Sequence, residues 1–462
     1  MELLLTMLGL AKYFVIGASI LMLLEQNHML PSKISAAFVV FFAFLYGIIA
    51  TSILLHIGLA TNLLPLMHVL TWALALVGLI QLATKYRNST HLLLQGDWRA
   101  RSAFILGYTW QVILLTFQPV MANDARAIWL LKAKALFSGT IPFFTYLQNK
   151  TFAYSHQDYP ITIPLLYADI IRPMGHFWEP ASGILSWTFF AVLIIGLYGA
   201  IRQFTRLNKT LALLLTCAIF FTPEYMRQGW AGLADVPLSL FFFGSVLGLQ
   251  FISDRSCIQE YIIPISTAIL GATVKNEGQS FLLFTILLCA WLYSTTIIKA
   301  KTIARTDIVK QILSVGTLML VTLLPLAIWK IITWQYAIAN DVTSALNFHL
   351  VVSRIPVLFS EILPRVFDGY RFGILLVPAM LLLSLPRNQQ VYPLGTVLVL
   401  TQALTYLAVY LFTPYDLAWH ISTSFSRLVL HLLPVLFLLT LVRFSNQESS
   451  NCLIGHAKIN HA

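Results

Sequence analysis

The segment ILSWTFFAVLIIGLYGAI, residues 184–201, contains no charged side chain and is one of many apolar runs in this chain. About 20 consecutive apolar residues are enough to cross the hydrocarbon core of a bilayer as an α-helix. The segment therefore predicts a membrane-spanning helix, and the question becomes how many more the chain contains.

The composition places the whole chain in the same class. Of its 462 residues, 58% are hydrophobic and 10% are charged, whereas roughly a quarter of a soluble domain is charged. The net charge of +11 comes from cations scattered between apolar runs. This distribution suits anionic lipids or a phosphate ligand better than nucleic acid. No Gly-rich phosphate loop, nucleotide fingerprint or metal-type His/Cys cluster is present. We predict an integral membrane protein that binds membrane lipids and no nucleic acid.

The apolar runs predict an all-α, polytopic protein with about thirteen transmembrane helices, within a range of eleven to fourteen. The candidate spans lie near 3–24, 34–57, 62–84, 102–121, 184–201, 210–222, 232–252, 261–274, 279–298, 312–333, 372–385, 391–412 and 427–443. The short runs 210–222 and 261–274 could be half-spans that meet at an interior site.

Alternate short loops are rich in Lys and Arg, and such loops face the cytoplasm. Loops 85–101 and 299–310 carry most of these cations. The N-terminus is then outside, and a polar tail over 444–462 is inside. Residues 122–183 form a long outer loop with amphipathic helices, and residues 334–370 form a second outer loop. Residues 1–84 are interpreted as a three-helix membrane module that precedes a larger transmembrane domain over 85–443.

The first outer loop opens with the amphipathic stretch QPVMANDARAIWLLKAKALFSG, residues 118–139. If Asp124 begins a helix that runs to about Phe137, the residues at helical spacing from Asp124 form a line along one face of that helix. Lys132 and Lys134 then lie on either side of this line. Helical side chains lean toward the N-terminus, so both lysines would lean toward Asp124. Alternatively, Asp124 caps the helix and the cations only reach for the membrane surface.

Further ionisable residues follow at the outer ends of later apolar runs. They are His156 and Asp158 in YSHQDYPITIPLL, Glu224, Arg227 and Asp235 in FFTPEYMRQGWAGLADVPLSLFFFG, and Lys275 and Glu277 in GATVKNEGQSFLLF. Helix starts and a turn explain part of this pattern. Charged side chains so close to a bilayer are costly, and they usually face a bundle interior or a water-filled cavity.

The final cluster lies in TPYDLAWHISTSFSRLVLHLLP. In a helix, Asp416, His420, Ser424, Arg427 and His431 follow steps of 4, 4, 3 and 4. This spacing predicts one polar stripe that enters the last span. All five clusters fall on the outer side of the predicted topology.

These clusters resemble those of GT-C glycosyltransferases, in particular the group that includes protein O-mannosyltransferases and the lipid A aminoarabinose transferase. The resemblance rests on Asp124 at the start of the outer-loop helix, and on HQDYPITIPLL, GLADVPLSL, KNEG and WHISTSFSRL. It implies an inverting transferase that takes a sugar from a polyprenyl-phosphate carrier to a glycan, lipid or protein acceptor. It also implies a bacterial inner-membrane location with the active site on the outer, periplasmic face.

The chain departs from that family in two respects. The family's first outer loop usually carries two adjacent acids, whereas this chain has Asn123 before Asp124. With one carboxylate there, metal dependence is open, and we predict no metal or other cofactor. Family members usually have one span before that loop, whereas this chain has four predicted spans, and 1–84 is therefore interpreted as an added module.

The chemistry requires a base for the acceptor hydroxyl and cations for the departing phosphate. Asp124 is the candidate base, and Asp158 could position the acceptor or share that role. Candidate phosphate-binding residues are Lys132, Lys134, Lys275 and Arg427. Candidate substrate-binding residues are His156, Glu224, Arg227, Asp235, Glu277, Asp416 and His420.

Three other functions are alternatives to a glycosyltransferase. A transporter of an anionic solute could use short spans and buried charges, but the chain shows no internal repeat. Another lipid-linked-glycan enzyme, such as a polymerase or ligase, would also place Arg and His on outer loops. A structural or assembly protein would not need five clusters of acids and bases on one face.

Overall fold

The computed structural model describes residues 1–26, 35–85, 98–252, 257–299, 305–340, 349–372 and 393–445. Within these residues the chain forms helices and no strand, which confirms the prediction of an all-α protein. A helix satisfies its backbone hydrogen bonds within one segment, and this is what an apolar chain needs where water is absent.

The helices follow the predicted apolar runs. Up to the end of the first outer loop they are α1 (Glu2–Gln26), α2 (Ala36–Ala60), α3 (Leu64–Lys85), α5 (Trp98–Thr116), the π-helix η2 (Ala125–Leu130), α6 (Leu131–Ser138), α7 (Thr140–Gln148), the 3-10 helix η3 (Lys150–Ser155), α8 (Thr162–Ile171) and the 3-10 helix η4 (Arg172–Met174). The remainder are α9 (Pro180–Phe204), α10 (Lys209–Phe220), α11 (Pro223–Trp230), α12 (Asp235–Gln250), the 3-10 helix η5 (Ile258–Tyr261), α13 (Ile262–Ala272), α14 (Glu277–Lys299), α15 (Arg305–Gln335), α16 (Val351–Val366), α17 (Gly369–Phe372), α19 (Pro393–Phe412) and α20 (Leu417–Ser445).

Eight described helices are long and apolar enough to cross a membrane, so the chain is a multi-pass membrane protein. A ninth span results if α11 and α12, which meet at an angle of 107°, are counted as one broken span. The count of about thirteen is not confirmed. α10 and α13 are shorter apolar helices, and the predicted run 372–385 falls almost entirely outside the described residues.

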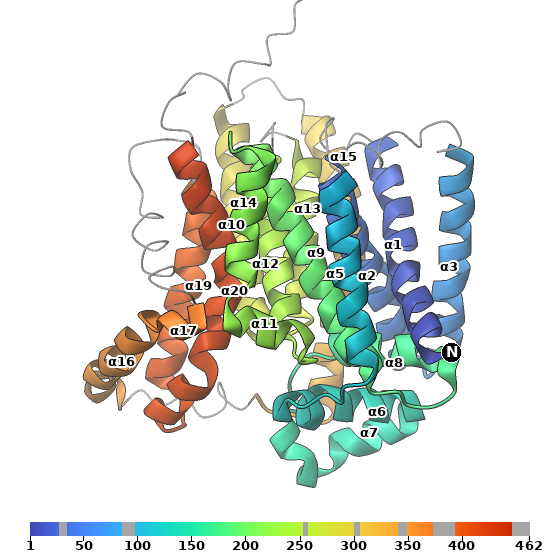
Figure 1. Ribbon diagram of the computed structural model, residues 1–462, viewed down its shortest axis with the longest axis horizontal. Coiled ribbons are helices and arrows are strands. Elements are labelled where there is room, and N and C mark those ends of the chain that lie inside the picture. Colours follow the sequence, from blue (N-terminus) through green and yellow to red (C-terminus); the bar gives the residue numbers. More distant parts are fainter. Residues whose placement is uncertain are drawn as a thin grey trace, which may run out of the picture.

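The helices of both predicted outer loops lie at one end of the bundle. Figure 1 shows α6, α7 and α8 at the lower end, with α16 lying across that end beside α17. The N-terminus lies at the same end. The intervening loops 86–97 and 300–304 lie outside the described residues, as does most of the tail. Which end faces the cytoplasm therefore stays a prediction.

The first two helices touch through their backbones. A Cβ atom added at Gly17 would lie 1.6 Å from the carbonyl oxygen of Ala43, and one added at Gly47 would lie 1.8 Å from that of Tyr13. Small residues at such a contact let helices approach closely, which is a common source of helix association in membranes. α3 packs on both helices and completes the N-terminal three-helix unit.

The N-terminal unit is also joined to the rest of the bundle. α2 packs against α9 and α15, and its phenylalanines enter the main core. Phe41, for example, meets Phe243 of α12 edge to face, with ring centroids 5.7 Å apart. A second core lies beneath the first outer loop, where α2, α7, α8 and α15 meet around the buried Trp329. The boundary at residue 84 is not tested by this packing and stays a prediction.

Replacing Gly17 by Val should destabilise the protein by about 1–3 kcal/mol or more, because the new side chain meets backbone that cannot yield. The measurement is thermal unfolding in detergent. Gly107→Val is the matched control, because Gly107 of α5 has nothing within 4 Å of an added Cβ. An equal effect of the two substitutions would contradict the close contact of α1 with α2.

Candidate functional site

Asp124 and Arg427 form an ion pair at the lower end of the bundle, although they are 303 positions apart in the chain. Arg427 Nη1 donates to Asp124 Oδ2, and about 45% of the Asp124 side chain and 24% of the Arg427 side chain remain exposed. The structure therefore brings the candidate base and one candidate phosphate-binding residue into contact. Asp124 stands at the N-cap of η2, but its side chain makes no capping hydrogen bond. Helix capping therefore does not explain this carboxylate.

A second group of charges lies where α12 and α14 begin. Lys275 Nζ is 2.9 Å from Asp235 Oδ1 and 3.0 Å from Glu277 Oε1, and the Lys275 side chain is 5% exposed. Asp235 also lies 3.0 Å from Nε2 of His431, whose other ring nitrogen is 3.0 Å from the hydroxyl of Tyr406. The N-terminal end of α12 thus presents a carboxylate that a lysine and a histidine hold from two sides.

The turn at residues 275–277, which contains Lys275 and Glu277, also holds the first predicted outer loop in place. Asn276 Nδ2 donates to Asp158 Oδ2 at 2.6 Å, and Asn340 Nδ2 donates to the same oxygen at 2.7 Å. Trp329 donates to the backbone carbonyl of Asp158 at 3.2 Å. Residues 275–277 therefore connect Asp158 with Asp235. We call Asp124, Asp158, Asp235, Lys275, Glu277 and Arg427 the outer site, after the predicted outer loops; which face of the membrane it occupies stays a prediction.

The C-terminal helix supplies the predicted polar stripe. α20 begins at Leu417, with Asp416 as its cap, since Asp416 Oδ1 accepts the Trp419 N–H at 2.8 Å. Along the stripe, Ser424 bonds Tyr410 at 2.8 Å, Arg427 reaches Asp124 and His431 reaches Asp235. Ser424, Arg427 and His431 therefore lie along α20 as their spacing in the sequence predicted. Asp416 itself is exposed and serves as a cap.

Burial and neighbouring charge act in opposite directions on Lys275. Burial lowers the pKa of its ammonium group, but the carboxylates of Asp235 and Glu277 outweigh that effect, and the pKa is raised. Lys275 is therefore charged at neutral pH. Burial also raises the pKa of Tyr159 well above its usual value, helped by Glu277 and Asp158, so this phenol is protonated and able to donate. Its ring centroid lies 6.0 Å from Lys275 Nζ.

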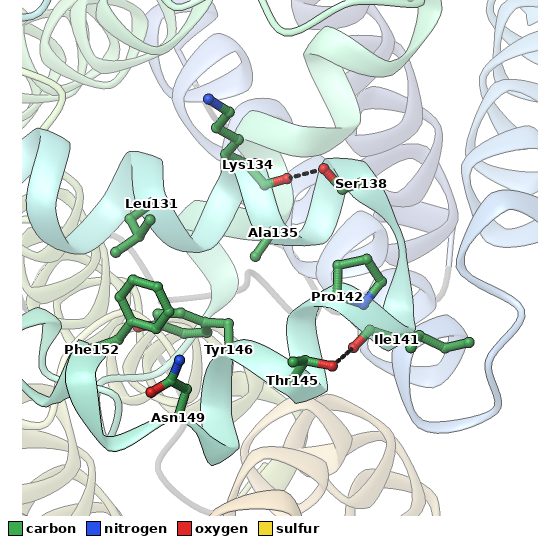
Figure 2. Close-up of a pocket in the computed structure, with 10 residues that line it drawn as sticks. All are labelled: Leu131, Lys134, Ala135, Ser138, Ile141, Pro142, Thr145, Tyr146, Asn149 and Phe152. Atoms are coloured by element: carbon green, nitrogen blue, oxygen red, sulfur yellow. Dashed lines mark hydrogen bonds between the residues drawn. The ribbon is translucent and has the colours of Figure 1, made fainter.

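The two lysines of α6 face different surroundings. Lys132 is fully buried, and its ammonium group donates to the carbonyls of His156 at 2.5 Å and Tyr159 at 3.4 Å. Lys134 is exposed beside an open pocket of about 430 Å³ between α6 and α7. Its ammonium group points away from the Tyr146 and Phe152 rings across that pocket (Figure 2). Phosphate binding by either lysine stays a prediction. In this conformation the Lys132 ammonium group bonds the loop that contains His156 and Tyr159.

The remaining predicted residues make local contacts. Glu224 accepts from Arg227 at 2.7 Å and from Gln228 at 3.0 Å, all within α11. The ring of His156 stacks on Tyr159 with centroids 4.8 Å apart. His420 lies edge-on to the rings of Tyr410 and Tyr415 at the exposed end of α20.

Several residues that sequence analysis did not propose as site residues contribute to these contacts. Asn276, His431 and Tyr159 lay inside the segments quoted above, but Asn340 and Tyr406 carried no signal. A separate buried group of Lys12, Tyr13, His68, Thr71 and Asp169 also went unnoticed. A lysine within an apolar run was the available signal, because an intramembrane charge is usually functional or paired.

No three His, Cys, Asp or Glu side chains gather as a possible metal-binding set in the described part of the chain. Comparisons with protein-family models, with curated proteins and with solved structures found no match for this chain. The resemblance to GT-C enzymes accordingly stays a prediction, and any function has to be argued from the outer site.

Replacing Lys275 by Met should destabilise the protein by about 3 kcal/mol or more, because Asp235 and Glu277 lose a buried partner. Thermal unfolding in detergent measures the effect. Lys134→Met, the exposed counterpart, should change stability by no more than about 0.5 kcal/mol. Adding Asp235→Asn to Lys275→Met should restore part of the loss. An unchanged unfolding temperature for Lys275→Met would show that this ion pair is not formed.

Proposed function

We propose that this protein is a membrane glycosyltransferase that moves a sugar from a polyprenyl-phosphate carrier to a glycan, lipid or protein acceptor at the outer face of the membrane. The observation that supports it most is the ion pair of Asp124 with Arg427. It joins a carboxylate at the start of the first outer loop to an arginine on the polar stripe of the last span.

The outer site has the groups that such a reaction needs. The acceptor hydroxyl oxygen attacks the anomeric carbon while Asp124 takes the hydroxyl proton. The bond from that carbon to the phosphate oxygen breaks, and its electron pair leaves with the polyprenyl phosphate. Arg427 can hold the departing phosphate through two parallel N–H groups, and Lys275 adds a fixed positive charge nearby.

The ion pair suggests how donor binding prepares the base. In this structure the Asp124 carboxylate is bonded to Arg427 and is therefore not free to contact an acceptor hydroxyl through that oxygen. A donor phosphate is a competing anion for Arg427. When it takes the guanidinium group, the Asp124 carboxylate is released for the acceptor. Arg427 Nε and Glu277 Oε2 are two of the buried side-chain atoms without a hydrogen-bond partner in the described residues, and both belong to the outer site.

One observation favours a second candidate, a transporter of an anionic solute. The 107° break between α11 and α12 places the N-terminus of α12, with Asp235, at a bend in the bundle. Transporters build midplane sites from broken helices of this kind. A transfer assay with a lipid-linked sugar separates the two functions, because a transporter leaves the bond between sugar and phosphate intact.

Replacing Asp124 by Asn should lower transfer by at least about 100-fold, since general base catalysis contributes roughly 10²–10⁴-fold. The substitution should at the same time tighten binding of polyprenyl phosphate, because Asn does not compete for Arg427. Transfer is measured with purified protein and a lipid-linked sugar, and binding with polyprenyl phosphate alone. Arg427→Lys should weaken both, since a point charge cannot replace the planar fork of Arg.

The control is Glu361→Gln, which removes a carboxylate paired with Arg365 on the outer helix α16. It should leave transfer and binding unchanged. Near-normal transfer by Asp124→Asn would move the base to Asp158. Weaker binding of polyprenyl phosphate by Asp124→Asn would contradict the competition for Arg427.

A further inference from the structure

A buried network of polar groups joins the N-terminal helices to α8. Asp169 Oδ2 accepts from Lys12 at 2.6 Å and from Tyr13 at 2.7 Å, and Asp169 Oδ1 lies 2.6 Å from Nδ1 of His68. Lys12 also donates to the hydroxyl of Thr71 at 3.0 Å. The side chains of Lys12 and Asp169 are fully buried. Two residues of α1 and two of α3 thus surround one carboxylate of α8.

Such a network specifies an arrangement more than it stabilises one. Buried charges are costly, and the attraction between them often does no more than offset that cost. An arrangement in which one of these groups loses its partner leaves a buried charge unpaired, which costs free energy. α8 can therefore pack against α1 and α3 in only one way without that cost. Three groups converging on both oxygens of Asp169 fix the position of α8 and its rotation about its axis.

The other end of α8 leads directly into the outer site. α8 begins at Thr162, four residues after Asp158. The Thr162 N–H donates to the Thr273 carbonyl at 3.4 Å, and its hydroxyl lies 3.3 Å from that of Ser52 in α2. Thr273 belongs to the turn whose Asn276 holds Asp158. A shift of α8 would therefore move Asp158 relative to Asn276 and Lys275.

We propose that Lys12, Tyr13 and His68 are positioning residues, and that the N-terminal helices α1 to α3 serve to hold the Asp158 loop at the outer site through Asp169. The catalytic part of this inference rests on the proposed function, in which Asp158 positions the acceptor. The positioning of the Asp158 loop by Asp169 does not depend on the proposed function. The network lies outside the reacting groups and acts through α8.

The test compares the parent protein with Lys12→Met/Asp169→Asn, which removes both charges together and leaves neither unpaired. Spin labels at Tyr154→Cys beside the Asp158 loop and at Ser422→Cys on α20 report the position of the loop relative to α20. Both sites are exposed, and the four native cysteines are replaced in the parent. We expect the folded double variant to show a wider distance distribution than the parent. Glu361→Gln/Arg365→Met, which removes the α16 ion pair, is the matched control and should match the parent.

A transfer assay on the unlabelled variants supplies the second measurement. We expect kcat to fall by roughly 10- to 100-fold with little change in the donor KM, because a displacement of about 1 Å can cost about 100-fold. Tyr13→Phe removes only the hydroxyl that bonds Asp169 Oδ2 at 2.7 Å and the Leu166 carbonyl at 3.5 Å, and it should give a smaller change of the same kind. If the double variant does not fold, Tyr13→Phe provides the test of the positioning role.

An unchanged distance distribution in a folded network variant would overturn the proposal and leave the network a purely stabilising device. If the parent shows no transfer with any lipid-linked sugar, the proposed function fails. The distance measurement still tests the positioning role in that case, so the two failures are distinguishable.

Discussion

A charge inside an apolar bundle must be paired, and this constraint organises the lower end of the molecule. Lys275 lies between Asp235 and Glu277, while Arg427 reaches across the chain to Asp124. Each pair joins segments far apart in the sequence, so the pairs fix how α12, α14, α20 and the first outer loop meet. The apolar helices supply the scaffold, and these polar contacts determine how the helix ends meet at the site.

The same constraint gives the N-terminal helices a role. Their glycine contact makes α1 and α2 a tight pair, and Asp169 ties that pair and α3 to α8. The outer site is consequently held from two directions. The polar stripe of α20 holds it from the C-terminal side, and α8 holds it from the N-terminal side. The partly exposed Asp124 carboxylate and Arg427 guanidinium group can then face each other in a fixed geometry.

Sequence reasoning predicted the helices well, because apolar runs in a membrane have no alternative to helix. It also predicted the stripe on α20, because the 3.6-residue period holds there without interruption. It did not predict that the Lys132 ammonium group bonds the carbonyls of His156 and Tyr159, because these contacts depend on how the loop folds back over α6. It did not identify the group of Lys12, His68 and Asp169: Lys12 carried a signal as a lysine in an apolar run, but the three residues lie in different segments and only packing brings them together. The role of Asn340 was hidden for the same reason.

In the proposed reaction, the outer site receives the phosphate of a polyprenyl carrier. The most direct measurement is photo-crosslinking of the purified protein with a polyprenyl phosphate that carries a photoreactive group beside the phosphate, followed by mass spectrometry of the labelled peptides. We expect label on residues 417–431 and on the turn 273–277, reduced by excess polyprenyl phosphate but not by polyprenol. Label confined to lipid-facing helices such as α3, or equal competition by polyprenol, would contradict it.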